Sequence, residues 1–285
     1  MLIATTRRLA GATALAALGL SLAACGADSS SGQDDTELSP DQVVLASYED
    51  LRGQSYTMES IITINGVPFV ESTSEVNSDG SRTSQDMRLS ALLDLVGDEM
   101  AQDPALADMM ALMFSDVHTE SILVDGVLYM QMSGGVYAAI DAQYGPDAWF
   151  TIDIAEQADL EEALDKVGGF DLAAQTETLL NSLTDVRETS PGVYTATLRP
   201  DTGPMESIMD SMGTVGATAA VESIEMTITL DDSGLLRSME MNIPELEGAT
   251  MQIVSTVADI GGQYDVAPPT STNLHPFESL VGIMG

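Results

Sequence analysis

The residue types that most often carry catalysis or bind metals are scarce in this 285-residue chain. Its two histidines, His118 and His275, have no partners at metal-binding spacing, and Cys25 is the single cysteine, so a zinc site is not expected. The chain has no nucleophile-elbow, zincin, P-loop or dinucleotide-binding motif. Acidic residues are so frequent that no carboxylate pair can be singled out as acid and base. We therefore expect neither an enzyme nor a bound cofactor.

Two short motifs and one aromatic cluster allow more than one interpretation. The sequences "NSDG" at 77–80 and "DDSG" at 231–234 contain calcium-type ligands, but their position between alternating segments favours tight turns. The aromatic cluster could form a platform for stacking a sugar, or its members could pack across a sheet, which is the interpretation that we prefer. It consists of Tyr129, Tyr137, Tyr144 and Trp149.

The single cysteine has a distinctive context. Arg7 and Arg8 precede the uncharged run "LAGATALAALGLSL", whose length is within the roughly 7–15 residues of a signal-peptide core and below the about 20 residues of a membrane-spanning helix. The run ends in "LAAC" before Gly26, which looks like a bacterial lipobox. An ordinary secretory signal with an incidental cysteine is the alternative. We expect a lipoprotein signal peptide over 1–24 and acyl chains such as palmitate on Cys25, because a free thiol in an exported protein is an oxidation liability.

The charge of the chain restricts its partners. The formal net charge is −36, and all 45 acidic residues follow Cys25. Such a chain is repelled by anionic lipid headgroups and by nucleic acid, so we exclude nucleic acid as a partner and assign membrane attachment to the acyl anchor. Residues 25–40 are polar and unpatterned, which predicts a flexible tether. The expected location is the outer, extracytoplasmic face of the cell membrane, in the periplasm or its equivalent.

Hydrophobic periodicity predicts both helices and strands. Period-two alternation, punctuated by turns such as Asn65-Gly66 and Asp125-Gly126, predicts strands over 55–64, 67–76, 82–90, 119–124, 127–132, 147–153, 184–198, 221–243 and 248–260. Helical spacing is found over 40–53, 92–113, 154–183 and 205–212. A glycine-rich loop is expected over 133–146, and the prolines after residue 266 should break any further strand.

This order of elements predicts an α+β fold, with one long antiparallel sheet and helices on one face. We expect a single domain over 41–267 and a C-terminal tail over 268–285.

Methionine is the most unusual feature of the apolar positions. Sixteen of the 17 methionines follow the signal segment, and only 13 residues of the whole chain are aromatic. The run "LADMMALMF" at 106–114 places three methionines on one face of an expected helix. Methionine is flexible and specifies a unique packing poorly, so these faces suit a wall that deforms around acyl chains. A methionine-rich but fully packed core explains the composition equally well.

Several phrases occur in a characteristic order along residues 41–266. They are "SYTMESIITI" after the first helix, "VDGVLYMQM" followed by "AWFTID", "GVYTATL" and "MTITLDDSGLLRSMEMNI". In this order, and with the lipobox, the chain resembles the LppX–LprAFG family of actinobacterial lipoproteins, within the LolA/LolB-like lipid carriers. The resemblance implies a LolA-like fold, in which a curved antiparallel half-barrel has helices over its concave face and an apolar cavity between the layers. It also implies that Cys25 is the lipid-attachment site and that no catalytic residue is to be carried over.

The chain departs from what a phosphorylated cargo would require. Apart from the signal, it has one lysine, Lys166, and six arginines, which are too few for a basic cluster at a cavity mouth. A neutral or weakly charged lipid suits this composition better, although Arg237, on an otherwise apolar strand face, could bind one anionic group.

These inferences predict a membrane-anchored lipoprotein that binds the acyl chains of a lipid or glycolipid for transport or hand-off, with a membrane lipid transporter as a possible partner. The alternative is a surface lipoprotein acting as a protein-interaction or regulatory module without cargo. The face assignments predict that the cavity is lined by Met58, Ile62, Ile64, Leu92, Val96, Met100, Leu106, Met109, Met110, Met113, Ile224, Met226, Ile228, Met239 and Met241.

Overall fold

The computed structural model describes residues 38–90, 115–154, 179–199, 223–246 and 249–280. All of these residues belong to one compact unit, Leu38–Gly285. The expected signal peptide, Cys25, most of the tether and most of the expected helices therefore lie outside the described residues. The same holds for seven predicted cavity residues, which are Leu92, Val96, Met100, Leu106, Met109, Met110 and Met113.

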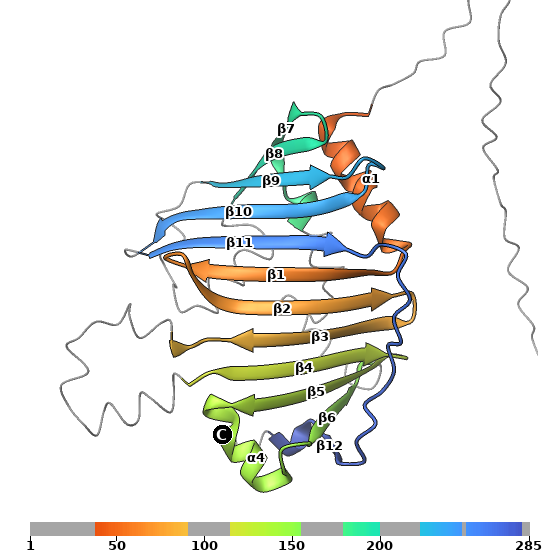
Figure 1. The fold of residues 1–285 in the computed structure, drawn as a ribbon, viewed down its shortest axis with the longest axis vertical. Coiled ribbons are helices and arrows are strands. Elements are labelled where there is room, and N and C mark those ends of the chain that lie inside the picture. Colours follow the sequence, from red (N-terminus) through yellow and green to blue (C-terminus); the bar gives the residue numbers. More distant parts are fainter. Residues whose placement is uncertain (1–37, 91–114, 155–178, 200–222, 247–248, 281–285) are drawn as a thin grey trace, which may run out of the picture. The chain divides into compact units, whose positions relative to one another are not determined.

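A single twelve-stranded sheet dominates the described part of the chain (Figure 1). The strands are β1 (Tyr56–Ile64), β2 (Val67–Asn77), β3 (Gly80–Met87), β4 (Val117–Val124), β5 (Val127–Gly134), β6 (Trp149–Asp153), β7 (Thr184–Ser190), β8 (Val193–Leu198), β9 (Ile224–Leu230), β10 (Leu236–Leu246), β11 (Ala249–Ala258) and β12 (Leu274–Pro276). Their order is β12-β6-β5-β4-β3-β2-β1-β11-β10-β9-β8-β7. Every pair is antiparallel except β12 with β6. The expected long antiparallel sheet is confirmed except at its edge, where β12 pairs with β6 in parallel.

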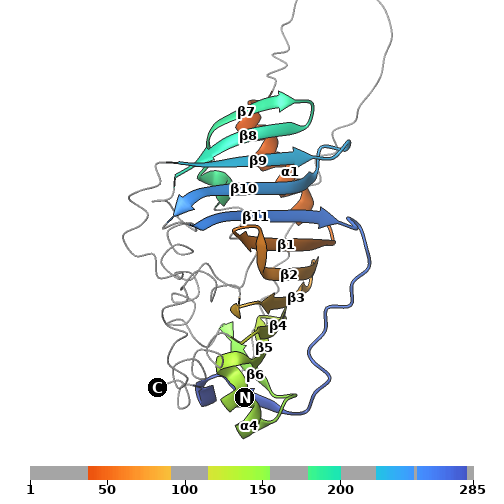
Figure 2. The ribbon, with the colours of Figure 1, turned by 60° about the vertical axis from the view of Figure 1, so that its left-hand side comes forward.

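The strand order shows two meanders joined at their inner edges. Strands β1 to β6 follow one another outward in one direction, and β7 to β11 return so that β11 pairs with β1. The predicted tight turns connect β1 to β2 and β4 to β5. Both central residues of each turn have positive φ, 51° and 78° at Asn65-Gly66 and 53° and 76° at Asp125-Gly126. This geometry matches a type I′ turn, whose twist agrees with that of the flanking strands. Figure 2 shows that the sheet is twisted and curved.

Two α-helices with both ends described accompany the sheet, one of 13 residues and one of 7 residues. The first, α1 (Pro40–Arg52), begins with proline in its first turn, where the missing N–H costs no hydrogen bond. The backbone N–H of Ser39, the residue that precedes the helix, donates to Gln42 Oε1 at 3.0 Å and is thereby satisfied. The second, α4 (Ala138–Tyr144), follows a short 3-10 turn, η2 (Gly135–Tyr137). No helix among the described residues is long and apolar enough to span a membrane.

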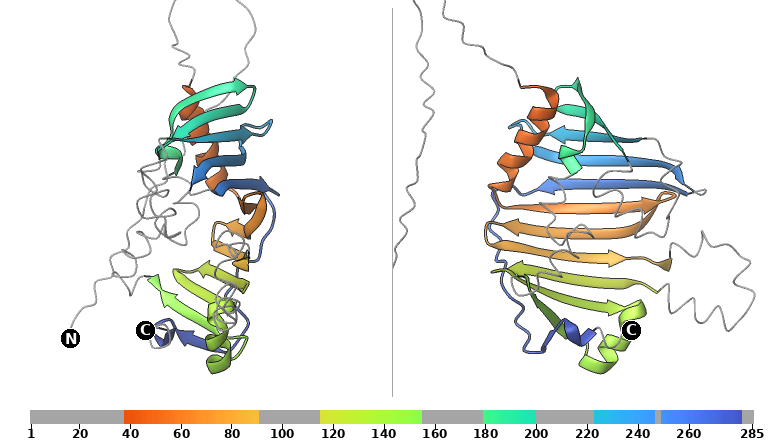
Figure 3. Two further views of the ribbon diagram at one scale, coloured as in Figure 1. Left: turned by 90° about the vertical axis from the view of Figure 1, so that its left-hand side faces the viewer. Right: turned by 180° about the vertical axis from the view of Figure 1, so that it is seen from behind.

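Both helices pack on the same face of the sheet, which we call the inner face. One cross-strand row of directly paired residues defines it, namely Met58, Ser74, Thr83, Ser121 and Met130 on β1 to β5. Directly paired residues point to the same side of a sheet. Met58 belongs to the core cluster that contains residues of α1, and Met130 belongs to the cluster that contains Ile140 of α4. Figure 3 shows α1 in front of the sheet in the view from behind.

The segment after β11 crosses the opposite, outer face of the sheet. Residues 259–273, which we call the strap, run along one end of the strands from β11 to β12 (Figure 1). Val266 of the strap is buried with Ile122, Val124 and Trp149, whose side chains alternate away from the inner face.

Two expectations are wrong, one about residues 133–146 and one about the C-terminal tail. The glycine-rich segment at 133–146 contains η2 and α4, because Ile140 is buried in the cluster on β5 and β6 and this packing stabilises a short helix. The proline-containing tail also adds a strand. The edge position of β12 allows this, since Pro276 there has no interior ladder bond to donate. Beyond β12, Leu280 is fully buried against the same cluster.

Candidate functional site: the inner face of the sheet

The inner face has a densely packed cluster at each end. Near α1, the cluster contains Val44, Tyr48 and Leu51 of the helix together with inner-face residues of β1 and β8 to β11. The burial of Tyr194 of β8 in this cluster raises the pKa of its phenol, and the charge of Glu188 adds to the shift. Burying this much aromatic and aliphatic surface is the main stabilising contribution of α1 to the fold.

The opposite end is closed in a similar way. Phe150 of β6 is fully buried, and Tyr144 of α4 meets it edge to face with ring centroids 5.4 Å apart. Tyr144 also donates a hydrogen bond from its hydroxyl to the Ser279 carbonyl at 3.1 Å. The segment after β12 is therefore fixed to this cluster by both apolar and polar contacts.

The predicted cavity residues on strands share one face, as expected from their alternation. The cross-strand register places them all on the inner face; they are Met58, Ile62, Ile64, Ile224, Met226, Ile228, Met239 and Met241. Most are buried in clusters with the protein's own side chains, and Ile62 is partly buried. Their contact with a ligand stays a prediction. The part of the inner face that neither α1 nor α4 covers lies between the two clusters.

The middle of the inner face carries uncharged polar side chains, which we call the polar band. The band crosses five neighbouring strands in two rows and consists of Ser74, Thr83 and Ser121 in one row and Ser255, Ser60, Ser72, Gln85 and Thr119 in the other. Ser74 is buried and the other members are partly buried. The band contains no charged residue.

Some members of the polar band bond to one another. The hydroxyls of Ser60 and Ser255 are 2.7 Å apart, and those of Ser74 and Thr83 are 2.9 Å apart. The side chains of Thr119 and Ser121 have no hydrogen-bond partner within the described part of the chain. Their hydroxyl oxygens stay accessible to water, since no serine or threonine oxygen of the described residues is buried without a partner. The band is therefore the part of the inner face whose polar groups are available to a ligand or to water.

Apolar side chains surround the polar band. On one side along the strands lies a row of Tyr56, Val76 and Leu123, interrupted by Ser81. On the other side lies the row Ile253, Ile62, Val70, Met87 and Val117. Methionines flank the band across the strands, with Met58 and Met239 toward α1 and Met130 and Met132 toward α4. Of these four, Met58 and Met239 were predicted from the sequence as cavity residues, whereas Met130 and Met132 were not.

The charged residues of the central strands point to the outer face. Arg82 and Glu120 form an ion pair with Nε and Oε1 3.3 Å apart, and His118 Nδ1 lies 2.8 Å from Asp86 Oδ1. All four alternate with members of the polar band along β3 and β4. This segregation leaves the inner face of the central strands uncharged.

Arg237 does not occupy the position expected for an anion-binding group. The register between β9 and β10 shifts between Leu236 and Ser238. As a result Leu236 is fully buried in the α1 cluster, whereas Arg237 is exposed and donates a hydrogen bond to the Val257 carbonyl. The alternation read from the sequence failed here because a bulge cannot be seen in a two-residue period.

A hollow of about 620 Å³ opens at the end of the inner face that lies nearest the β2–β3 turn. The row Tyr56, Val76, Ser81 and Leu123 contributes to its lining, and so does Ile154 beyond β6. The hollow also reaches the β4–β5 turn and Arg52 at the end of α1. Ligand pockets in proteins enclose roughly 300–1,000 Å³, so this hollow is large enough for part of a small ligand. We call it the mouth.

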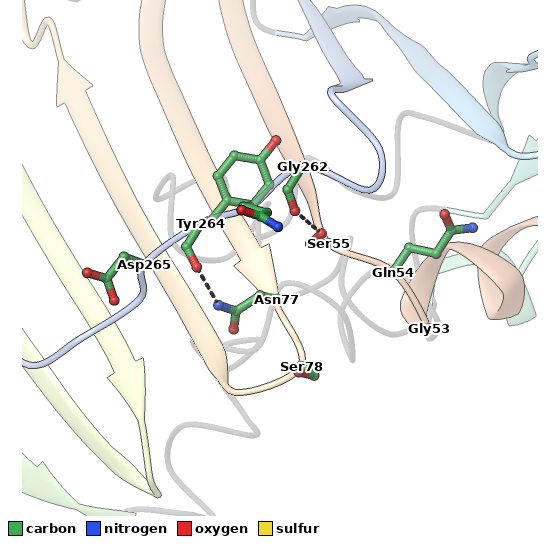
Figure 4. A pocket seen from close by; sticks show the side chains of 9 residues that line it. Gly53, Gln54, Ser55, Asn77, Ser78, Gly262, Tyr264 and Asp265 are labelled. Carbon is green, nitrogen blue, oxygen red and sulfur yellow. Dashed lines mark hydrogen bonds between the residues drawn. The ribbon is translucent and has the colours of Figure 1, made fainter.

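A second hollow of about 430 Å³ lies beside the mouth, between the end of α1, the β2–β3 turn and the strap. Figure 4 shows how side chains hold its walls together. Ser55 Oγ donates to the Gly262 carbonyl, and Asn77 Nδ2 donates to the Tyr264 carbonyl at 3.0 Å. Its lining is polar apart from the ring of Tyr264. These bonds attach the strap to the sheet, and the surface does not suit an acyl chain.

The two calcium-like motifs form turns, as expected. Asn77 Oδ1 accepts the backbone N–H of Gly80 at 2.9 Å. Asp231 Oδ1 accepts the backbone N–H groups of Ser233 and Leu235, at 2.8 and 3.0 Å. The Ser233 hydroxyl also bonds to Asp231 and is the main reason for the lowered pKa of this carboxyl. Among the described residues no three acidic, histidine or cysteine side chains are grouped so that they could hold a metal ion.

The aromatic cluster predicted from the sequence does not form one platform. Tyr129 and Trp149 pack under the strap on the outer face, whereas Tyr137 and Tyr144 pack with α4 on the inner face. Packing against the sheet, the preferred interpretation, is therefore correct, and stacking of a sugar on all four rings is excluded by their separation across the sheet.

The alternation of polar and apolar residues did not predict the polar band. Its signal is present, because "ESTSEVN" and "SRTSQDM" on β2 and β3 have polar residues on both faces of the strand, which is unusual for strands in the centre of a sheet.

Neither a known protein family nor a curated protein matches the chain.

Proposed function

We propose that the protein binds the acyl chains of a lipid or glycolipid against the inner face of its sheet, with entry at the mouth. The mouth is the observation that carries this proposal, because it is a hollow of about 620 Å³ whose lining includes Tyr56, Val76 and Leu123 of the row beside the polar band. A sixteen-carbon chain costs on the order of 12 kcal/mol when exposed to water, and apolar protein surface offsets most of this cost. The bordering methionines would adjust to chains of different length.

The wider proposal includes the anchor and the location. A lipoprotein signal peptide ending before Cys25 and acylation of this cysteine would hold the protein at the outer face of the cell membrane, where it would receive or pass on lipid together with a membrane transporter. The resemblance to the LppX–LprAFG lipoproteins and a LolA-like arrangement of helices over the curved sheet belong to the same proposal. The curved sheet with α1 and α4 on its inner face is consistent with it.

Anchoring is tested separately from lipid binding. In a bacterium that acylates exported lipoproteins, the full chain should incorporate labelled palmitate and remain with the membrane fraction, and Cys25→Ser should do neither. Palmitate incorporation into the Cys25→Ser variant would contradict the assignment of Cys25.

Lipid binding is tested with delipidated protein that lacks residues 1–25 and with a fluorescent fatty-acyl probe. Replacing Val76 and Leu123 of the mouth together by glutamate places two charges where the chain would enter, so the affinity should fall by about tenfold or more. The matched control replaces Thr57 and Thr73 by glutamate, because these residues lie on β1 and β2 but face outward. Failure of the wild-type protein to bind the probe, or an equal loss in the control, would contradict the proposal.

The alternative function, a protein-interaction module without cargo, is favoured by one observation. The clusters at both ends of the inner face are closed by the protein's own side chains, as the full burial of Leu51, Ile228 and Phe150 illustrates. Mass spectrometry of the organic extract from natively purified protein separates the two functions, since a carrier should retain lipid and an interaction module should not.

A further inference from the structure

The polar band gives the proposed carrier a means of selecting its lipid, and we propose that it does so by bonding the uncharged oxygen atoms of the lipid's polar part. This inference rests on the proposed function. The recognised class is a neutral acyl lipid whose ester carbonyls or hydroxyls lie over the band while its chains cover the apolar rows beside it. Phospholipids with the same chains would be bound more weakly.

The position of the band supports this assignment. It occupies the centre of the inner face, and apolar residues border it both along and across the strands. A lipid with an uncharged polar centre and hydrocarbon chains has the same distribution of polar and apolar groups. A purely apolar wall would hold the chains without fixing where the ester groups lie.

The chemistry of the band supports it further. Hydroxyl groups donate to ester carbonyls and both donate to and accept from lipid hydroxyls. Thr119 and Ser121 on β4 are partly buried and have no hydrogen-bond partner among the described residues, so each can bond to a ligand without breaking an existing contact. A ligand that bonds to these hydroxyls replaces the water that otherwise bonds to them, whereas a ligand that covers them with apolar groups leaves them without a partner.

The charge distribution disfavours an anionic headgroup. The band contains no lysine or arginine. Arg82 of β3 is paired with Glu120, and Arg88, which follows β3, is paired with Glu71. The mouth is lined by Asp79 and Asp125, with Arg52 as the single cationic residue among the described lining residues. A phosphate entering here would meet carboxylates and would find no guanidinium pair to replace its hydration.

The test uses the same delipidated protein lacking residues 1–25 and displacement of the fluorescent acyl probe. The competitors are 1,2-dioleoylglycerol, the same lipid bearing one hexose, and dioleoylphosphatidylglycerol. We expect the wild-type protein to bind the tighter-binding of the two neutral lipids with about tenfold higher affinity than the phospholipid. The relative affinities of the two neutral lipids then show whether ester groups or sugar hydroxyls are recognised.

A variant combining Thr119→Val with Ser121→Ala removes the two unpartnered hydroxyls. Its affinity for neutral lipid should fall by about tenfold, the change expected for roughly one net hydrogen bond, while its affinity for the acyl probe stays within twofold of wild type. The matched control, Thr73→Val with Ser84→Ala, removes the same groups from the outer face of β2 and β3 and should change neither affinity.

Three results would overturn the inference. They are equal or tighter binding of the phospholipid by the wild-type protein, no loss of neutral-lipid affinity in the band variant, and an equal loss for the probe and the neutral lipid. Binding of the probe with any of these patterns leaves the proposed function standing, whereas absence of probe binding in the wild-type protein overturns both. A thermal unfolding midpoint close to that of wild type shows that the band variant is folded.

Discussion

The two ends of the inner face and its middle are built from the same sheet, yet their side chains are used differently. At the ends, α1 and α4 cover large apolar residues such as Ile228 and Phe150, which are fully buried. In the middle, five strands present serine, threonine and glutamine, and most of these side chains are only partly buried. Stability and recognition are therefore expected to reside in different regions of one face.

The reason for the difference lies in what each region gains from burial. A buried aromatic or branched side chain stabilises the fold by about 1.5–3 kcal/mol. A serine in the same place contributes little and requires a hydrogen-bond partner. A sheet whose centre consists of such residues is stabilised from its two ends. The strap adds to this by joining β11 to β12 across the outer face, where Val266 is buried.

The largest effect is expected at the end of the sheet near α4. Phe150→Ala should lower the free energy of unfolding by about 3–5 kcal/mol, because the ring is fully buried and contacts Tyr144. Chemical denaturation followed by circular dichroism measures it. A loss below about 1 kcal/mol would mean that this end is not the source of stability that its packing indicates.

A smaller but clear effect is expected where the middle of the sheet is held in register. A Cβ atom added at Gly80 would overlap the Leu123 carbonyl oxygen on the neighbouring strand, so Gly80→Ala should destabilise the fold by about 1–3 kcal/mol. Gly53→Ala at the end of α1 is the control, since its added Cβ meets only ordinary contacts and the backbone there has no positive φ. Equal thermal unfolding midpoints for the two variants would contradict the prediction.

The end near α1 should show a dependence on alkaline pH that the middle lacks. Burial raises the pKa of Tyr194, so its stabilising contribution is complete below the ordinary tyrosine pKa of 10.0 and is lost as the pH rises through the higher value in the folded protein. Tyr194→Phe should therefore reduce the decline of stability above pH 10, by less than about 1 kcal/mol. Denaturation midpoints at pH 9 and pH 11 give the comparison, and an unchanged decline would assign it to other groups.

The smallest effect is expected within the polar band. Replacing Ser60 and Ser255 together by alanine removes both partners of one hydrogen bond and leaves neither unsatisfied, so stability should change by about 0.5 kcal/mol or less. The single variant Ser255→Ala leaves the Ser60 hydroxyl without this partner and should be the less stable of the two. A double variant several kcal/mol less stable than wild type would show that the band belongs to the core.

The sequence alone was sufficient to predict most of the described local elements, although α4 and β12 were not predicted. Alternation and the turns at Asn65-Gly66 and Asp125-Gly126 predicted the strands of both meanders, since a two-residue period and a positive φ at both turn positions are local properties. The amphipathic pattern likewise predicted α1. The same alternation correctly grouped Met58, Met226 and Met241 on one face.

The tertiary structure decided which residues of that face share a neighbourhood. Pairing of β11 with β1 places Ser255 beside Ser60, although 194 residues separate them, and no periodicity within either strand encodes this contact. It also decided that Arg237 leaves the apolar side through a bulge and that a proline-containing tail pairs with β6. These features depend on the register between distant strands and on the pairing of an exposed edge strand. Their free energies arise from contacts between segments, so no single segment of the sequence encodes them.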